Sequence, residues 1–433
     1  MRRLVGFARR ALPPGTASVG LGLGVLGVTG YVVLGLASHA LDAVDYSAFS
    51  VLWTIVFAVG PGLFFPLEQE LSRAVSARTE RGEAPGRVVA KVGALAVGFL
   101  AVLLVVLAVT WDFVTAELFG GDSAVTLALA LNVGALALAH LSRGVLAGTG
   151  RFGRYGAQLG VDGLLRSVLV VSLVFAGAQS PATLGVAIAA AQVAAVLVTS
   201  LPATRLGAGP PVRWSVVSAG LGLLLAATLF AQVLVNVGPA IAQLLSPNPA
   251  LAGELLSASV LARIPVFVYA SLQASLLPSL SRAVAAGDTE RFRGFLRRGL
   301  GAVAVLGLVG VAGCALLGPW LVGVLFDGIG LVGRTDLAML AAGTAVYLVA
   351  MVLGQALVAL GRTGSQALAW TVGFVVLAMV TALPLDVLLR VELGYLLGSA
   401  AVAVVAGVSL TRHRADRPAA VPAPAAVLPG VIE

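Results

Sequence analysis

About twelve apolar segments, each close to 20 residues long, run through the chain and limit what it can fold into. A helix of this length crosses the hydrocarbon core of a bilayer. Only 11% of the residues are charged and 59% are apolar, whereas about a quarter of a soluble domain is charged. The sequence therefore predicts an all-α integral membrane protein. The segments lie at 17–37, 47–66, 91–111, 123–148, 157–178, 182–202, 215–237, 252–277, 299–325, 336–360, 367–388 and 393–411.

The distribution of basic residues tests this division, because cytoplasmic loops carry an excess of Lys and Arg. With the amino terminus placed in the cytoplasm, the 27 Lys and Arg residues fall on that side, except Arg166, Arg263, Arg334 and Arg390. Both termini are therefore predicted to be cytoplasmic. The net charge of +8 then reflects membrane topology, and we expect no nucleic-acid partner.

Short sequence motifs recur in the two halves of the chain. LSRAVSA at 71–77 returns as LSRAVAA at 280–286, and the pattern Gly-Arg-x-Gly at 150–153 returns at 361–364. Six helices per half give both halves the same orientation, related by a pseudo-two-fold axis along the membrane normal, with a cavity between them. We expect an amino-terminal six-helix bundle at 1–205, a cytoplasmic linker at 206–214, a carboxy-terminal six-helix bundle at 215–411 and a disordered cytoplasmic tail at 412–433.

Arg263 is the first candidate for a substrate-binding residue. It stands about eleven residues into the eighth segment, near the bilayer midplane. A cation there costs about 2.5–3.5 kcal/mol on insertion scales, so it normally faces a cavity or a partner. An anionic substrate and a structural bond to carbonyls of another helix both remain open. Pro265, two residues on, is expected to weaken the helix and expose carbonyls beside it.

Other polar residues within the segments have two interpretations each. Asp162 and Arg166 are four positions apart and either neutralise each other or line the cavity, where the arginine exchanges its carboxylate for a substrate phosphate. His140 shares a helix face with Arg143 and either titrates or packs the cytoplasmic end. The uncharged candidates either bind sugar hydroxyls or link helices. These uncharged candidates are Asn236, Gln232 and Gln273.

Enzyme chemistry is not expected. The sequence has no Ser/His/Asp, paired-carboxylate or Cys/His constellation, and the outside loops are too short for a catalytic domain. The lone cysteine, Cys314, rules out a disulfide framework and a metal cluster of cysteines. We predict no catalytic residue, no metal site and no cofactor.

Two stretches resemble a known superfamily. The region from Glu254 to Leu300 is similar to the eighth-helix region of the multidrug/oligosaccharidyl-lipid/polysaccharide (MOP) exporters. Within it, the sequence LLPSLSRA at 276–283 carries most of the resemblance. The sequence LSRGVLAGTGRFGRYG at 141–156, at the end of the fourth segment, resembles that of bacterial polysaccharide-unit flippases of the Wzx type. The resemblance implies a MATE-like fold. It also implies movement of a polyprenyl-pyrophosphate-linked oligosaccharide from the inner to the outer leaflet of the bacterial cytoplasmic membrane by alternating access, for cell-surface polysaccharide synthesis.

The implied partners are the lipid-linked glycan, membrane lipids and polysaccharide polymerase or assembly proteins. Coupling to a proton or sodium gradient stays open, with Asp162, Glu254 and His140 as candidates for titrating residues. A MATE-type multidrug or cation antiporter is the first alternative, because that branch relies on membrane-embedded carboxylates such as Asp162 and Glu254. A lipid II flippase is the second alternative. The lipid II flippases carry fourteen helices and a more arginine-rich first bundle, so the absence of arginine from the first two segments here counts against this alternative.

Overall fold

The computed structural model describes residues 16–200, 207–211 and 221–412. The amino-terminal half contains α2 (Thr16–Ala40), α3 (Ala43–Val59), the π-helical turn η1 (Gly60–Phe64), α4 (Phe65–Thr79), α5 (Gly86–Val109), α6 (Trp111–Phe113), the π-helical turn η2 (Val114–Leu118), α7 (Ser123–Gly148), α8 (Phe152–Phe175) and α9 (Pro181–Ser200). The carboxy-terminal half contains α11 (Leu221–Asn236), α12 (Gly238–Leu245), α13 (Leu251–Ala262), α14 (Ile264–Ala285), α15 (Thr289–Phe326), α16 (Arg334–Ala359), α17 (Thr363–Thr381) and α18 (Val387–Arg412).

These helices confirm the all-α membrane fold. Among the described residues, eleven helices are long and apolar enough to cross a membrane. Helices α11 and α12 meet at 58° and together supply a twelfth span. Each span corresponds to one predicted segment. The long apolar helices also explain the exposed valines of α5, such as Val97, Val102 and Val109, because these side chains face lipid in such a fold.

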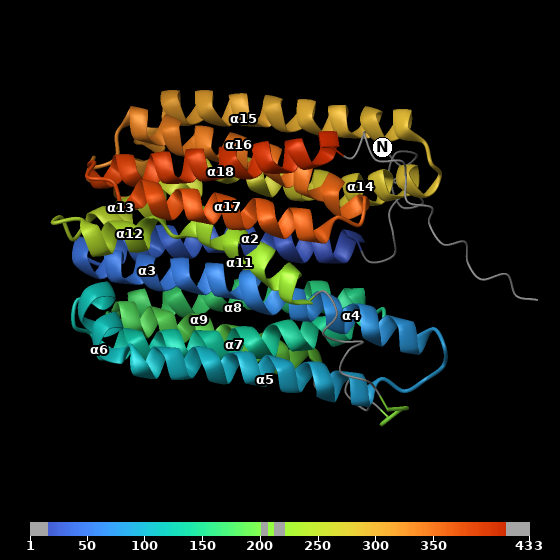
Figure 1. Cartoon of the computed structure of the whole chain (residues 1–433). Helices are drawn as coiled ribbons and strands as arrows, with labels where there is room; N and C mark the ends of the chain where they lie inside the picture. Colours follow the sequence, from blue (N-terminus) through green and yellow to red (C-terminus); the bar gives the residue numbers. More distant parts are fainter. Residues whose placement is uncertain (1–15, 201–206, 212–220, 413–433) are drawn as a thin grey trace, which may run out of the picture.

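Two helical bundles lie side by side (Figure 1). Helices α5, α7, α8 and α9 form one side and α14 to α18 the other, while α2, α3 and α11 lie between them. We call α2–α9 the amino-terminal bundle and α11–α18 the carboxy-terminal bundle. Of the predicted linker at 206–214 the structure describes 207–211, and the tail after Arg412 lies outside the described residues, so the exact domain boundaries stay predictions.

The repeated Gly-Arg-x-Gly patterns adopt the same local structure in both bundles. Gly150 and Gly361 have φ values of 72° and 71°, a left-handed conformation that glycine adopts without a steric penalty. The amide of Arg151 donates to the carbonyl of Leu146 at 2.8 Å, and that of Arg362 to Leu357 at 2.9 Å. Each glycine thus ends a helix by the same Schellman motif.

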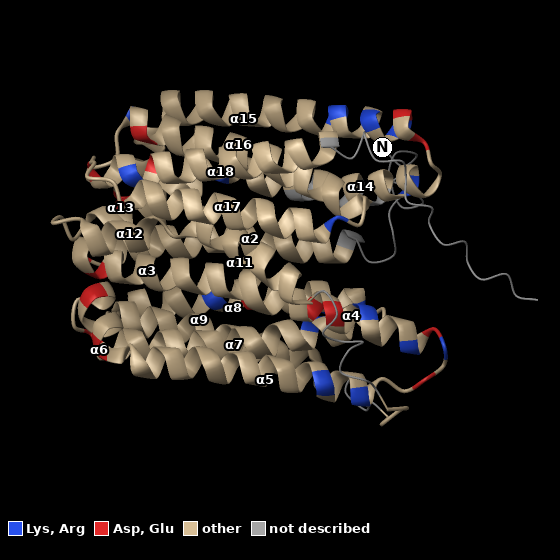
Figure 2. Ribbon diagram, in the orientation of Figure 1, with Lys and Arg blue, Asp and Glu red and all other residues tan. Residues whose placement is uncertain are grey.

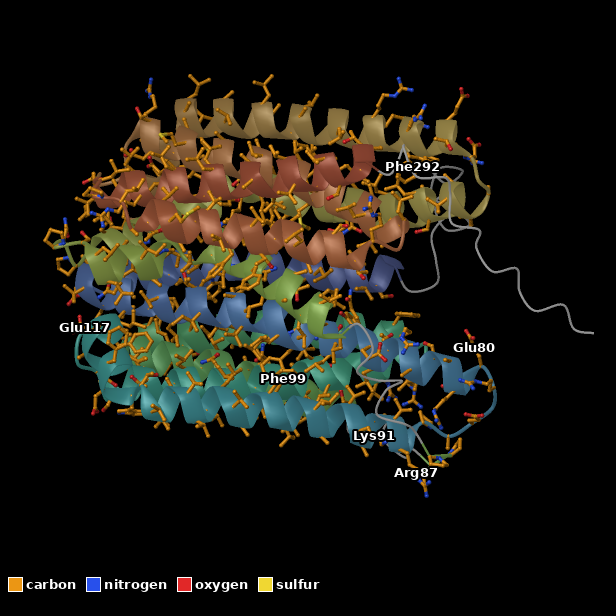
Figure 3. All side chains as sticks on the ribbon, in the orientation of Figure 1. Glu80, Arg87, Lys91, Phe99, Glu117 and Phe292 are labelled. Carbon is orange, nitrogen blue, oxygen red and sulfur yellow. The ribbon has the colours of Figure 1, made fainter. Side chains whose placement is uncertain are left out.

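Most charged residues lie at the two ends of the bundles, and Lys and Arg gather mainly at one of these ends, as Figure 2 shows. The basic end holds the loops between α4 and α5 and between α14 and α15, and Figure 3 places Arg87 and Lys91 there. The acidic end holds the loops that precede α3, α7, α13 and α16; Glu117 lies at this end. This separation agrees with the topology predicted from the arginines, in which the basic end is cytoplasmic.

The bundles contact each other at the acidic end. The hydroxyl of Tyr46 in α3 lies 2.9 Å from Ser257 Oγ in α13, and the amide of Gly253 donates to Ser47 Oγ at 3.0 Å. These four residues form what we call the acidic-end seam. The seam holds α3 and α13 at close range, since a Cβ at Gly253 would lie 2.7 Å from Tyr46 Cδ1.

Candidate functional site

The eighth span breaks at Arg263. Helix α13 ends at Ala262 and α14 begins at Ile264, with Arg263 between them at φ −95° and ψ 2°. Pro265 lacks an amide hydrogen and its ring crowds the preceding turn, which favours an interruption of the helix at this point. The predicted weakening of the helix by Pro265 is therefore confirmed.

The break places Arg263 beside two other residues that were predicted to bind the substrate. Arg263 Nη1 donates to Asn236 Oδ1 at 2.9 Å, and Asn236 Nδ2 donates to Gln232 Oε1 at 3.0 Å. Arg263, Asn236 and Gln232 thus form one hydrogen-bonded row from α11 to the α13–α14 break. Arg263 Nε is buried and has no hydrogen-bond partner among the described residues.

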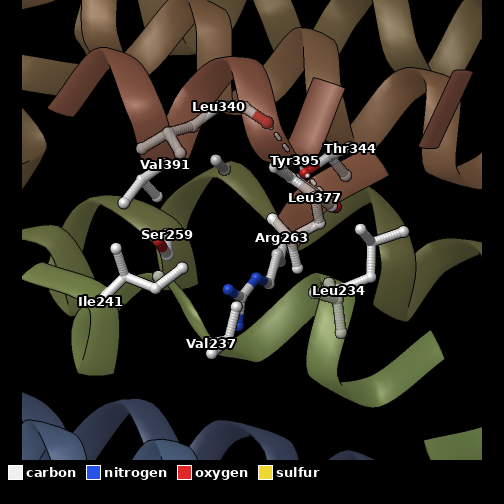
Figure 4. Close-up of a pocket in the computed structure, with 13 residues that line it drawn as sticks. Leu234, Val237, Ile241, Ser259, Arg263, Leu340, Thr344, Leu377, Val391 and Tyr395 are labelled. Atoms are coloured by element: carbon white, nitrogen blue, oxygen red, sulfur yellow. Dashed lines mark hydrogen bonds between the residues drawn. The ribbon is translucent and has the colours of Figure 1, made fainter. Parts of the chain in front are cut away.

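A pocket inside the carboxy-terminal bundle adjoins this row, with Arg263 at its centre (Figure 4). Its polar lining residues are Ser259, Arg263, Thr344 and Tyr395, and its other described lining residues are aliphatic or glycine. The hydroxyl of Tyr395 donates to Thr344 Oγ1 at 3.2 Å. Because no described residue that lines the pocket is acidic, the charge of Arg263 is not neutralised there.

Gln273 does not join this site. It lies half-buried in α14, ten residues beyond Arg263, which corresponds to about 15 Å along a helix. Within the described part of the chain it forms no hydrogen bond. Its expected role in binding the substrate stays a prediction.

Asp162 and Arg166 pair with each other inside the amino-terminal bundle. Arg166 Nη2 donates to both carboxylate oxygens of Asp162, at 3.0 and 3.2 Å, and both side chains are buried. The guanidinium also lies over the ring of Trp53, 5.9 Å from its centroid. The arrangement fits mutual neutralisation, which was one of the two interpretations of this pair.

Glu254 lies at the acidic end, in the first turn of α13. Its Oε1 accepts a hydrogen bond from the amide of Val332 at 3.0 Å, while its buried Oε2 has no partner among the described residues. Glu254 lines a second pocket, and Asp42 and Asp327 line this pocket too. This position is distant from the helix break at Arg263, because α13 separates the two by about nine residues, or about 13 Å.

His140 belongs to a buried polar cluster, of which the sequence predicted only that His140 and Arg143 lie on one helix face. His140 Nδ1 lies 2.7 Å from Glu68 Oε2, and Arg143 Nε lies 3.3 Å from the same oxygen. The hydroxyl of Tyr155 in α8 donates to Glu68 Oε1 at 2.6 Å. Glu68, His140, Arg143 and Tyr155 form what we call the Glu68 cluster, which joins α4, α7 and α8.

Glu68 was missed because the second apolar segment was taken to end at residue 66. Helix α4 instead continues to Thr79 and buries an apolar stripe of Leu67, Leu71 and Val75. The spacing of four between these residues is typical of a helix face, and it is the signal that the helix continues. Glu392 was missed for the same reason, since α18 begins at Val387 and buries this carboxylate to 2% exposure.

In the described part of the chain, no group of three or more His, Cys, Asp or Glu residues is arranged to hold a metal ion. No protein-family model matches the chain. The chain is similar to two uncharacterized proteins of Mycobacterium tuberculosis. It is 26% identical to Rv3630 over 394 residues, which cover 88% of each chain. It is also 26% identical to Rv1510 over 380 residues, which cover 85% of each chain.

Solved transporter structures share the fold. The chain matches the inward-facing conformation of a multidrug resistance MATE family transporter of the MOP superfamily with a TM-score of 0.74 and 12% identity, over 92% of this chain and 99% of that one. For the outward-facing conformation of such a transporter the TM-score is 0.66 and the identity 14%, over 93% and 96%. The protein thus has the multi-pass fold of the MATE transporters. These similarities do not distinguish a polysaccharide-unit flippase from a multidrug exporter.

Proposed function

We propose that the protein is a flippase that moves a polyprenyl-pyrophosphate-linked oligosaccharide from the inner to the outer leaflet by alternating access. The observation that carries the proposal is Arg263. It is a cation at a helix break within a membrane span. Among the described residues it bonds only to the neutral Asn236, and no described residue that lines its pocket is acidic. A pyrophosphate supplies the negative charge that this guanidinium lacks, and guanidinium–phosphate pairs are strong and often bidentate.

The neighbouring groups suit the rest of such a head group. Asn236, Ser259 and Tyr395 can exchange hydrogen bonds with sugar hydroxyls or phosphate oxygens. The long lipid tail need not enter the protein, because a polyprenyl chain is stable in the surrounding bilayer. Recognition of charge by Arg263 and of hydroxyls by neutral side chains gives one site for both parts of the cargo.

The relation of the bundles supports an alternating-access cycle. They are joined at the acidic end by the acidic-end seam, and the fold matches an inward-facing transporter more closely than an outward-facing one. In the proposed cycle the head group enters from the cytoplasmic side and binds Arg263. Rocking of the bundles then separates α3 from α13 and releases the head group on the outer side.

The test is the leaflet distribution of glycan-lipids in a bacterial strain whose own copy is deleted and replaced by a variant. An impermeant lectin or periodate label reports the outer leaflet. Arg263→Glu should cause one undecaprenyl-linked glycan to accumulate on the inner leaflet, and identification of that glycan names the cargo. Arg293→Glu, which alters an exposed arginine of α15, is the matched control and should transport normally. Full transport by a normally inserted Arg263→Glu variant would remove Arg263 from the mechanism.

A multidrug or cation antiporter is the second candidate, favoured by one observation. Glu254 has a buried oxygen without a partner, in a pocket that Asp42 and Asp327 also line, and carboxylates attract cations. An unchanged glycan distribution in the deletion strain, together with new sensitivity to cationic dyes, would support this candidate. Accumulation of lipid II on the inner leaflet would instead identify the cargo as the peptidoglycan precursor.

A further inference from the structure

The Glu68 cluster contains one carboxylate and two groups that can neutralise it. Glu68 is only 4% exposed, and His140 and Arg143 are buried with it. Arg143 Nε contacts Glu68 Oε2 at 3.3 Å but has no hydrogen bond of its own. The guanidinium therefore supplies charge to Glu68 without a well-aligned bond from Nε, and another cation can replace it as the counter-ion of Glu68.

The charges of the cluster determine the protonation of His140 in this arrangement. The charges of Glu68 and Arg143 already sum to zero. The imidazole of His140, whose Nδ1 proton bonds Glu68, is therefore neutral. A second cation on His140 would be repelled by Arg143 in a buried site where such repulsion is strong. No other titratable group of the described residues acts on Glu68, apart from the Tyr155 hydroxyl. This arrangement is the proton-free form.

We propose that the Glu68 cluster is a proton-binding site in which a proton on His140 and the guanidinium of Arg143 compete for the carboxylate of Glu68. When Arg143 leaves Glu68, His140 Nε2 takes a proton from solvent, and the imidazolium becomes the counter-ion of Glu68. When Arg143 returns, His140 gives that proton back to solvent. The inference deepens the proposed transport function, on which it rests, by naming the proton as the coupled ion.

The cluster adjoins the contact between the bundles. Glu68 follows the π-helical turn η1 by four residues, and Gly60 of η1 packs against His140, since a Cβ there would lie 3.5 Å from its Nε2. On the other side of η1, Thr228 Oγ1 of α11 lies 2.8 Å from the carbonyl of Gly62 and 2.8 Å from that of Leu224 in its own helix, so the two carbonyls share its hydrogen. π-helical turns are frequent at functional sites. A change of charge at His140 therefore acts next to the hydrogen bond that joins α11 to the amino-terminal bundle.

The experiment measures distances between the bundles as a function of pH, with no cargo present. Spin labels are placed at Glu80→Cys and Ala286→Cys, two exposed positions at the basic ends of α4 and α14, in a Cys314→Ala background. The full chain is reconstituted in nanodiscs of phosphatidylethanolamine and phosphatidylglycerol, and the distances are read by double electron–electron resonance between pH 5 and 9. We expect the distance distribution of this labelled parent to change with one midpoint.

Variants of the cluster then identify the group that binds the proton. Glu68→Gln should abolish the change, because an amide cannot stabilise the imidazolium. Arg143→Gln should move the midpoint to higher pH by about one unit or more, the usual effect of removing a nearby like charge. Arg143→Lys keeps the positive charge, so the midpoint of this variant should stay near that of the labelled parent.

Glu70→Gln is the matched control. Glu70 lies two residues from Glu68 on α4 but pairs with the exposed Arg73 at 2.5 Å, outside the cluster, so the pH response should be retained. Distances of the labelled parent that do not vary with pH, or an unaltered response in Glu68→Gln, would overturn the proposal. If Glu68→Gln does not insert, an unshifted midpoint in Arg143→Gln overturns it equally. The result does not depend on the cargo, so failure of the oligosaccharide hypothesis is recognised separately in the leaflet assay.

Discussion

Arg263 and Asn236 meet across the break of the eighth span, with Nη1 of the arginine donating to Oδ1 of the amide at 2.9 Å. Asn236 Nδ2 donates in turn to Gln232 Oε1, so the orientation of the amide is set by α11 itself. The bond holds the guanidinium in place but does not cancel its charge. An arginine that is positioned by a neutral partner remains able to bind an anion.

The first prediction is that Asn236→Asp keeps the stability of the protein but abolishes transport. The aspartate has nearly the same shape and accepts the same bond from Arg263. The amide of Gln232 can turn over and donate to the new carboxylate, so the free energy of unfolding should be unchanged or rise by about 1 kcal/mol. Transport should be lost, because the new carboxylate neutralises Arg263. The measurements are thermal unfolding in detergent and the leaflet distribution of the glycan-lipid.

Asn248→Asp makes the same substitution at an exposed turn, where the side-chain oxygen accepts from the amide of Ala250, and it serves as the control, with transport expected to be normal. Normal transport by Asn236→Asp would mean that the charge of Arg263 is not used.

The second prediction concerns the pair of Asp162 and Arg166. Because both are buried, Asp162→Leu alone leaves an uncompensated cation and should lower the free energy of unfolding by about 3–5 kcal/mol. Arg166→Met alone should cost a similar amount. The double variant should regain most of the stability and should still transport, as expected of a pair whose main contacts are internal.

The check is a double-mutant cycle by thermal unfolding, combined with the leaflet assay. A stable double variant that no longer transports would return the pair to the list of cargo-binding candidates.

The positions of the spans could be predicted from the sequence because the thickness of the bilayer fixes the length of each apolar segment. The break at Arg263 could be predicted because it follows from the local chemistry of Pro265. The partners of Glu68 could not, since they depend on how closely α4 and α7 approach. Gly148 permits that approach: a Cβ there would lie 2.6 Å from Val75 Cβ, a contact that no local pattern reveals.

The third prediction tests the equivalence of the bundles. Gly150→Ala and Gly361→Ala should each lower the free energy of unfolding by about 1–2 kcal/mol, because alanine is strained at the positive φ of both sites. Gly153→Ala should cost less, since Gly153 has no positive φ and a Cβ there meets nothing within 4 Å. Thermal unfolding of the three variants is the measurement. Unequal effects at Gly150 and Gly361 would mean that the two Schellman motifs do not bear equal strain.

The fourth prediction is that Gly253→Ala opens the acidic-end seam. The added Cβ would lie 2.7 Å from Tyr46 Cδ1 and 3.2 Å from Ser47 Oγ, so α13 must move away from α3. That movement breaks the bond between the Gly253 amide and Ser47 and lengthens the contact between Tyr46 and Ser257. The population should therefore shift toward conformers that are open at the acidic end.

The movement can be followed with a water-soluble maleimide and a Ser257→Cys reporter in the Cys314→Ala background, because Ser257 is buried in the seam. Labelling from outside the cell should be several-fold faster in Gly253→Ala than in Gly134→Ala, a helical glycine where a Cβ meets nothing within 4 Å. Equal rates would mean that the seam yields locally without separating the bundles. Faster labelling would show that contact between α3 and α13 is what keeps this end closed, as an alternating-access cycle requires of its outer gate.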